Sequence, residues 1–187
     1  MNPTPSSGPV LITDRLILRS PRWEDFDAYA AYVADPQGME HIGGAQSRPV
    51  AWRTFMAYAG AWATTGVSMF WVFERGPGGA EGAFVGRIGP WAPESWPGNE
   101  VGWGVATRFF GRGYAHEAAA ASLDYAFDAL GWTDVIHTID PANTPSERLA
   151  ARLGSKPLRD VLLPDPINKT VVAWGQTRED WRARRGS

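Results

Sequence analysis

Hydrophobic positions in the first third of the chain form one strand-like run and two helix-like runs. Residues 10–19 are rich in leucine and isoleucine, which predicts a first strand. A first helix is predicted over residues 23–34, because acids occupy its first turn and Asp35-Pro36 ends it. A second helix is predicted over residues 49–65, with Ser47 as its N-terminal cap and a glycine after its last turn.

The middle of the chain has the aromatic and β-branched runs that are typical of strands. Such runs predict strands over residues 67–74, 84–91 and 100–106. Glycine and proline between them, at residues 76–79 and 93–98, predict a turn and a loop. The three strands therefore follow one another as a meander.

The hydrophobic period then changes to that of a helix. From residue 114 to 130, apolar side chains recur at helical spacing, and Gly131 suits the end of that helix. Thr177 and Asp180 form a capping-box pattern that starts a terminal helix. The remaining elements are a strand at 134–139, a helix at 145–153, and a hairpin of strands at 161–163 and 170–174.

The order β-α-α-β-β-β-α-β-α-β-β predicts a mixed α+β fold in one domain. The pattern contains no repeat and no interdomain linker. Residues 1–9 are a Pro/Ser/Gly lead-in without the features of a signal peptide, so the folded domain is expected over residues 10–187.

Composition narrows the class of protein. The formal net charge of -2 argues against a nucleic-acid-binding surface, and no apolar run is long enough for a membrane span. The chain has no cysteine, and its three histidines, His41, His116 and His137, are scattered, so no metal site is expected. A cytoplasmic protein is the expectation.

Tryptophan is unusually abundant. Ten are present in 187 residues, and several lie between Trp52 and Trp103. Tryptophan offers a large flat apolar surface with one hydrogen-bond donor. The sequence leaves three uses open, namely core packing, the wall of a ligand pocket, and a homodimer interface.

The segment Arg108–Ala115, between a strand and the long helix, carries the clearest chemical signal. Two glycines, Gly111 and Gly113, allow a tight turn and the close approach of an anion. The following helix offers unpaired N–H groups and the positive end of its dipole, and Arg108 and Arg112 can add charge. The segment lacks the Gly-Lys-Ser/Thr ending of a Walker loop and the three spaced glycines of a dinucleotide fold.

This turn resembles the acetyl-CoA motif of the GNAT superfamily of N-acetyltransferases. Other segments resemble the branch of ribosomal-protein alanine acetyltransferases, the RimJ/RimL-like proteins, and the resemblance extends over residues 10–182. These segments are Thr13-Asp14-Arg15-Leu16-Ile17-Leu18-Arg19, Asp140-Pro141-Ala142-Asn143, Ser146-Glu147-Arg148-Leu149 and Thr177-Arg178-Glu179-Asp180-Trp181. The implied fold has a mostly antiparallel sheet of about seven strands, flanked by helices and splayed between its fourth and fifth strands.

The resemblance implies a cofactor site for acetyl-CoA, the acyl donor. The pyrophosphate is expected on the amides of Gly111 to Ala115, and the pantetheine arm along the strand edge from Trp103 to Val105. The residues implied in cofactor binding are Trp103, Val105, Arg108, Gly111, Arg112, Gly113, Tyr114, Ala115 and Asn143. For Asn143 a helix-cap role is equally compatible.

The implied reaction is direct attack of a neutral amine on the thioester, assisted by a base. Glu100 is the expected base because it opens the strand that leads to the turn; the alternative is a solvated strand-end carboxylate. Many relatives carry a tyrosine acid where this chain has Ala150, so Ser146 is the nearest candidate acid. His137 is expected to be structural or solvent-facing, and His116 solvated.

The acceptor is less constrained than the donor. His41, Trp91 and Trp96 are candidate acceptor-binding residues, with Trp52 as a further aromatic. A protein N-terminus, an amino acid and an aminoglycoside-like amine all remain open as the acceptor. The competing class is a non-catalytic acyl-CoA-binding module, which Ala150 favours; transfer of an acyl group to an amine separates the two.

Overall fold

The computed structural model describes residues 8–186, and within them one sheet of eight strands is ordered β1-β2-β3-β4-β5-β6-β8-β7. All neighbouring strands are antiparallel except β5 and β6. Most of the expected lead-in lies outside the described residues. The strands are β1 (Leu11–Ile12), β2 (Leu16–Arg19), β3 (Phe70–Arg75), β4 (Glu81–Trp91), β5 (Glu100–Val105), β6 (Asp134–Ile139), β7 (Lys156–Leu162) and β8 (Thr170–Thr177).

The mixed α+β fold is confirmed, with one strand more than the sequence predicts. The single strand expected over residues 10–19 is a hairpin, because the chain reverses between β1 and β2. Thr13 closes this turn, its amide donating to the Leu16 carbonyl at 3.0 Å and its hydroxyl accepting from the Leu16 amide at 3.0 Å. The later strands β7 and β8 are also longer than the predicted hairpin.

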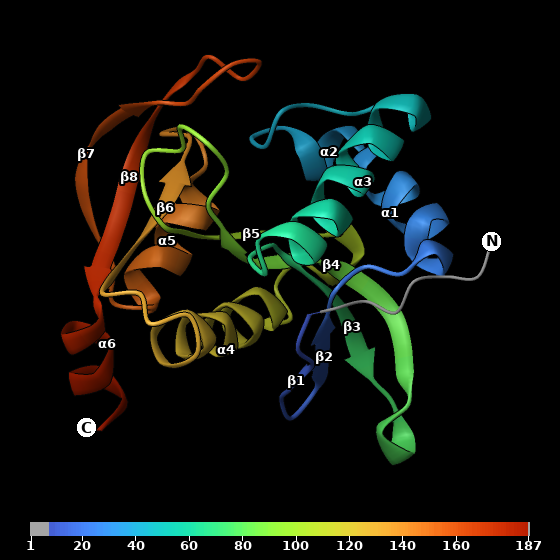
Figure 1. Ribbon diagram of the computed structural model, residues 1–187, viewed down its shortest axis with the longest axis horizontal. Helices are drawn as coiled ribbons and strands as arrows, with labels where there is room; N and C mark the ends of the chain where they lie inside the picture. The colour runs from blue at the N-terminus through green and yellow to red at the C-terminus, as the bar shows by residue number, and fades with distance from the viewer. Residues whose placement is uncertain (1–7, 187) are drawn as a thin grey trace.

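The helices cover both faces of the sheet (Figure 1). The helices α1, α2 and α3 lie together at upper right in the figure, and α4 crosses the sheet below. In addition to short 3-10 turns at Trp23–Asp25, Pro77–Gly79 and Thr107–Phe109, the helices are α1 (Phe26–Val33), α2 (Pro36–Met39), α3 (Arg48–Thr64), α4 (Tyr114–Asp128), α5 (Thr144–Arg152) and α6 (Arg178–Arg185).

Helix ends follow the sequence signals in part. The capping box of α6 is present, with the Thr177 hydroxyl accepting from the Asp180 amide. Ser47 occupies the N-cap of α3, but its side chain makes no capping hydrogen bond. The sequence missed α2, which begins where the first helix was expected to stop: Asp35 accepts from the Gln37 amide at 3.1 Å and Pro36 occupies the first turn.

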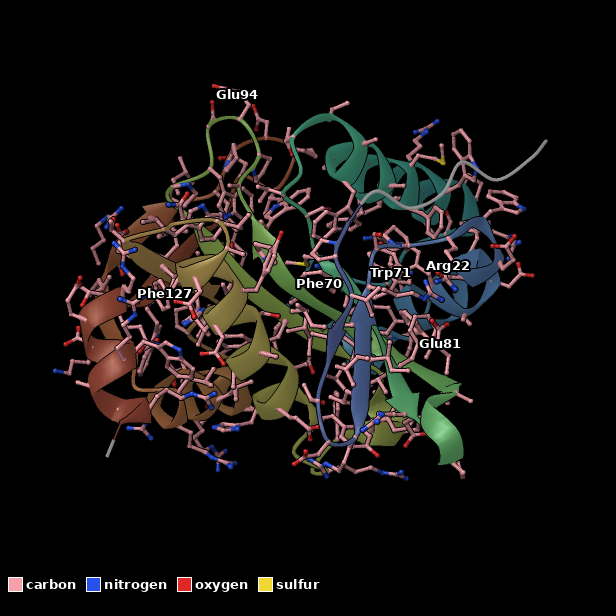
Figure 2. All side chains as sticks on the ribbon, turned by 60° about the horizontal axis from the view of Figure 1, so that its bottom comes forward. Arg22, Phe70, Trp71, Glu81, Glu94 and Phe127 are labelled. Carbon is pink, nitrogen blue, oxygen red and sulfur yellow. The ribbon has the colours of Figure 1, made fainter. Side chains whose placement is uncertain are left out.

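Aromatic side chains fill the layer between the sheet and α1–α3. Trp71 is fully buried and packs against Tyr29, Phe55 and Tyr58 at ring-centroid distances of 5.0, 5.7 and 5.4 Å. Its neighbour Phe70 faces the other way, towards Tyr125 of α4. Figure 2 labels Phe70 and Trp71 in the strand layer. The alternation places one large core on each face of β3.

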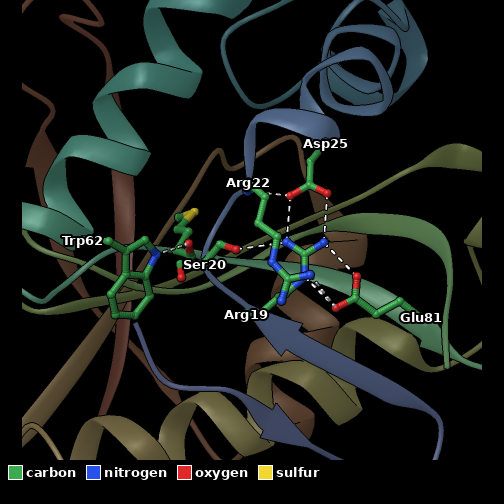
Figure 3. A network of polar contacts seen from close by, with 7 residues as sticks. Arg19, Ser20, Arg22, Asp25, Trp62 and Glu81 are labelled. Atoms are coloured by element: carbon green, nitrogen blue, oxygen red, sulfur yellow. Dashed lines mark hydrogen bonds and ion pairs between the residues drawn. The ribbon is translucent and has the colours of Figure 1, made fainter. Parts of the chain in front are cut away.

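A buried ion network fixes β2 to the first helical turn and to β4. The Arg19 guanidinium bonds both oxygens of Asp25, at 2.7 and 2.9 Å, and both oxygens of Glu81, at 2.7 and 2.8 Å (Figure 3). Bidentate pairing satisfies a cation whose burial would otherwise be costly. The network therefore holds the base of α1 against the sheet.

The only parallel junction of the sheet is also its weakest. Strands β5 and β6 pair through one position, Glu100 with Ile136, supported by a bond from the Ile136 amide to the Asn99 carbonyl at 2.8 Å. Beyond it the two strands diverge, as Figure 1 shows near the centre of the view. The expected splay between these two strands is confirmed.

Candidate active site

The segment after β5 folds into the expected tight turn. Gly111 and Gly113 have φ of 75° and 79°, a region that L residues rarely adopt. Gly113 is also the N-cap of α4. The first amides of α4 therefore have no partner inside the helix and lie at the positive end of its dipole, which makes the turn a suitable site for an anion.

A cavity of about 710 Å³ lies between this turn, β5, α5 and the loop after α2. Its walls include most of the predicted site residues, brought together from four separate segments. Those residues are His41, Trp103, Val105, Gly111, Arg112, Gly113, Tyr114, Ala115, Asn143 and Ser146. Glu100, Trp91, Trp96 and Arg108 are not among its lining residues.

Arg108 points away from the cavity. Its guanidinium donates to the Phe84 carbonyl at 2.9 Å and lies 4.9 Å from the Phe109 ring. It therefore ties the turn to β4 rather than offering charge to an anion. Arg112 lines the cavity. Two further cations, Arg148 and Arg152 of α5, line it as well and are not among the predicted site residues.

Residues from the first hairpin hold the turn in place. The Arg15 side chain donates to the Arg112 carbonyl at 3.0 Å and to Glu117 of α4 at 2.7 Å. Glu117 also accepts from the Thr13 hydroxyl and from the Arg15 amide. Burial works to raise the pKa of Glu117, but these hydrogen bonds outweigh it and lower that pKa. The segment at residues 13–19 thus supports the anion site from outside.

The free edge of β5 faces the cavity. The Val101 carbonyl points away from β4 and towards β6, where it accepts a hydrogen bond from His137 Nδ1 at 2.6 Å. Backbone groups of alternate residues point the same way in a strand, so those of Trp103 and Val105 point into the space between β5 and β6. That edge can pair with an extended, amide-containing ligand.

Two predicted residues meet at the start of α5. Asn143 is the N-cap, and its side-chain oxygen accepts from the Ser146 amide at 3.2 Å. The Ser146 hydroxyl accepts from the Trp103 indole at 3.1 Å. The capping role of Asn143 is confirmed, and this contact joins β5 to α5 across the splay.

Glu100 is buried, not solvated, with 6% of its surface exposed. It accepts hydrogen bonds from the Trp96 indole and, at 3.0 Å, from the Thr138 hydroxyl. Burial raises its pKa to about 7, against the opposing effect of these hydrogen bonds and of the Arg87 charge. A carboxylate in this state can take up and release a proton near neutral pH.

The histidines have separate surroundings. His137 is fully buried between the Val101 carbonyl and Ser155 Oγ, and burial lowers its pKa to about 4, so it is structural. His116 is half-buried rather than fully solvated, and burial lowers its pKa. His41 lies 3.6 Å from Asp140 at the cavity wall. Among the described residues, no group of three or more His, Cys, Asp or Glu could hold a metal ion.

The tryptophans expected near the acceptor separate into different roles. Trp91 packs on Tyr58 at 4.8 Å, and Trp96 packs on the apolar cluster of β7 and β8 while it bonds Glu100. Trp52 is 46% exposed on α3. Figure 2 shows Glu94 at the outer end of the loop that carries Trp96.

In the part of the chain described, no helix has the length and apolar character to cross a membrane.

Known proteins with similar sequences and structures agree on one family. A sequence model of the acetyltransferase (GNAT) domain matches residues 15–156. The chain is 34% identical over 178 residues to the uncharacterized protein YkkB of Bacillus subtilis, covering 89% of this chain and 90% of that protein.

Solved structures share the same fold. An acetyltransferase from Agrobacterium tumefaciens C58 superposes with a TM-score of 0.78 at 29% identity, over 91% of this chain and 95% of that one. Mycobacterium smegmatis RimJ, solved in complex with CoA-disulfide, superposes with a TM-score of 0.68 at 24% identity, over 96% of this chain and 91% of that one. The chain therefore belongs to the GNAT family and is an acyl-CoA-dependent acetyltransferase.

Proposed function

We propose that the chain transfers an acetyl group from acetyl-CoA to the primary amine of a small molecule or of a protein N-terminus. One observation carries the proposal: the anion-binding turn and the free edge of β5 border the same cavity of about 710 Å³. A phosphate site and an amide-pairing edge are the two features that a pyrophosphate followed by a pantetheine arm requires.

The donor is proposed to lie along the cavity. The amides of Gly111 to Ala115 bind the pyrophosphate, with Arg112 beside them, and the edge of Trp103 and Val105 pairs with the pantetheine arm. Tyr114 supports the turn, since its hydroxyl donates to Glu74 at 2.8 Å. Asn143 lines the opposite wall, where it both caps α5 and contacts the donor.

The chemistry proposed is a single displacement. The amine nitrogen attacks the thioester carbonyl carbon, forming a C–N bond, while the Val105 amide stabilises the negative charge on oxygen. The C–S bond then breaks. The amine proton passes through water to Glu100. The thiolate takes a proton from the hydroxyl of Ser146, and Ser146 is reprotonated from water as Glu100 releases the amine proton. His41, Trp91 and Trp96 are proposed on the acceptor side.

The finer assignments are proposals of the same kind. We place the chain in the RimJ/RimL-like branch, on the motifs at residues 13–19 and 140–149 and on the shared fold of RimJ. A cytoplasmic location is proposed from the sequence. A homodimer is proposed from exposed aromatic residues such as Trp23 and Trp52.

Calorimetric titration with acetyl-CoA tests the donor site. The variant Gly111→Trp fills the turn, and Gly131→Trp is its matched control, because both glycines have φ near 70° (75° and 71°) and space around them. Saturable binding that Gly111→Trp loses and Gly131→Trp retains supports the proposal, and release of free thiol with an amine present completes it. Absence of binding to the folded wild type refutes it.

A further inference from the structure

The sheet face beneath α1 and α3 carries polar side chains that do not line the cavity. Trp71, Arg87 and Gly104 are register partners across β3, β4 and β5. Because side chains alternate along a strand, Glu100 lies on the same face as Gly104, on the far side of Gly102. On the sheet face opposite α4, Arg87 and Glu100 therefore lie on either side of a surface formed by Gly102 and Gly104.

Arg87 forms no direct ion pair among the described residues, although its charge acts on Glu100 and its guanidinium lies 5.3 Å from the Tyr58 ring. Its one described hydrogen bond runs from Nη1 to the thioether sulfur of Met69 at 2.8 Å, and thioethers are weak acceptors. Its Nε is buried with no partner, and no ion pair to Arg87 occurs among the described residues. A guanidinium in this setting lacks the oxygen acceptors that it normally binds.

Three further donors near Arg87 are buried without partners. They are the hydroxyls of Tyr29 and Tyr32, which are 0% and 4% exposed, and the indole N–H of Trp71, which is 0% exposed. Tyr29 contacts both of the other rings. Burial raises the pKa of both tyrosines, to about 12 for Tyr32, while the Arg87 charge acts in the opposite direction. Both hydroxyls therefore stay protonated donors.

The cluster of Tyr29, Tyr32, Trp71 and Arg87 thus presents donors and a positive charge. Native interiors leave few polar groups unpaired, and several in one place call for an explanation. A carboxylate offers up to about four acceptor sites and one negative charge, which matches this set. A neutral amide would bring donors of its own and leave the guanidinium without a direct ion-pair partner.

The cluster connects to the reaction centre through Gly104. Gly104 lines the cavity, and a Cβ there would lie 2.2 Å from the Tyr32 hydroxyl oxygen. Met69 occupies the space on the other side: its methyl group lies 2.6 Å from a Cβ built at Gly102, and the Glu100 carboxylate lies 3.2 Å from the same point. Methionine is flexible and can repack around a ligand.

We propose that the acceptor is an amine carrying a nearby carboxylate, as in an α-amino acid, whose carboxylate binds Arg87, Tyr29 and Tyr32 while its amine faces Glu100. The inference rests on the proposed acetyl transfer and narrows its acceptor. A free carboxylate is absent from the amine end of a polypeptide unless the first side chain is acidic. The acceptor is accordingly a small molecule.

Matched acceptors test this inference. Phenylalanine, methionine and glutamine are each compared with their α-carboxamides. The value of kcat/KM is measured from thiol release and calculated from the concentration of the unprotonated amine. We expect the carboxylate form to exceed the amide by about tenfold to a hundredfold, as for hydrogen bonds to a charged group. Arg87→Met should abolish this preference, whereas Arg48→Met, an exposed cation on α3, should keep it.

A second variant guards against misfolding of Arg87→Met. Tyr29→Phe with Tyr32→Phe removes two hydroxyls that have no partner in the protein, so its fold and its acetyl-CoA binding should persist while the carboxylate preference falls. Equal rates for acids and amides, or a preference that survives in Arg87→Met, overturn the inference and leave acetyl transfer standing. If the folded, acetyl-CoA-binding protein acetylates no amine at all, both the inference and the proposed function fail.

Discussion

Replacing Glu100 with glutamine tests whether this carboxylate is the base. The side chain is buried beside Trp96 and Thr138, and burial raises its pKa to about 7. Only the ionised form can accept the amine proton, so the contribution of the base must follow the ionisation of this group. Glutamine keeps the size of the side chain and one acceptor oxygen, but it cannot take up a proton.

The magnitude follows from the pKa. With a midpoint of about 7, the ionised fraction is roughly 9% at pH 6 and roughly 91% at pH 8, a rise of about tenfold. The acceptor amine also loses its proton as the pH rises, but it does so equally in both proteins. The ratio of kcat/KM for wild type to that for Glu100→Gln should therefore rise about tenfold from pH 6 to pH 8 and then level off, at about a hundredfold.

The assay is thiol release at saturating acetyl-CoA between pH 5.5 and 9. Glu94→Gln is the control for loss of one negative charge, because Glu94 is exposed on the neighbouring loop. The ratio of kcat/KM for wild type to that for Glu94→Gln should stay constant over this pH range. A ratio for Glu100→Gln that is also flat across this range, with both proteins folded, would refute the role of Glu100 as the base.

Three other perturbations have defined outcomes. Thr138→Val removes hydroxyl bonds that lower the Glu100 pKa, so the midpoint of the rate profile should move above 7. Arg15→Met frees Glu117 and the turn, and the calorimetric Kd for acetyl-CoA should rise about threefold to tenfold, since the pair is half-exposed. His137 keeps a depressed pKa of about 4 against its usual 6.5, so its contribution to stability is complete above pH 6.5 and lost as the pH falls towards 4. The unfolding free energy of His137→Asn, from urea denaturation, should lack a decline of about 3 kcal/mol over that window.

The local features of the site were predictable from the sequence. Gly111 and Gly113 before a periodic run specify a turn at a helix N-terminus, because positive φ and helical spacing are properties of neighbouring residues. Asn143 was likewise recognisable as a cap. The strand count was off by one because Thr13 reverses the chain within an apolar run, and hydrophobicity alone does not show that reversal.

The orientations of side chains and the contacts between residues far apart in the sequence were not predictable. Arg108 has the right place but turns to the Phe84 carbonyl, a choice of rotamer that spacing does not determine. The burial of Glu100 depends on Trp96 folding back from a loop and on Thr138 arriving from β6. The strongest missed signal was Arg87, a charged residue inside an apolar strand, next to Ile88, which is fully buried.

The single pairing position between β5 and β6 has a consequence for hydrogen exchange. The amides of Gly102 and Gly104 face β4 and should exchange slowly, whereas those of Trp103 and Val105 face the opening and should exchange fast. The two parts of the sheet, β1–β5 and β6–β8, are joined at their closed end by α4, where Asp124 accepts from Trp181 of α6 at 2.8 Å. The two parts should unfold locally as separate cooperative units. Bound acetyl-CoA, which pairs with β5 and contacts α5, would couple them. Protection gained at Trp103 and Val105 would then spread to β6 and β8, far from any atom of the ligand.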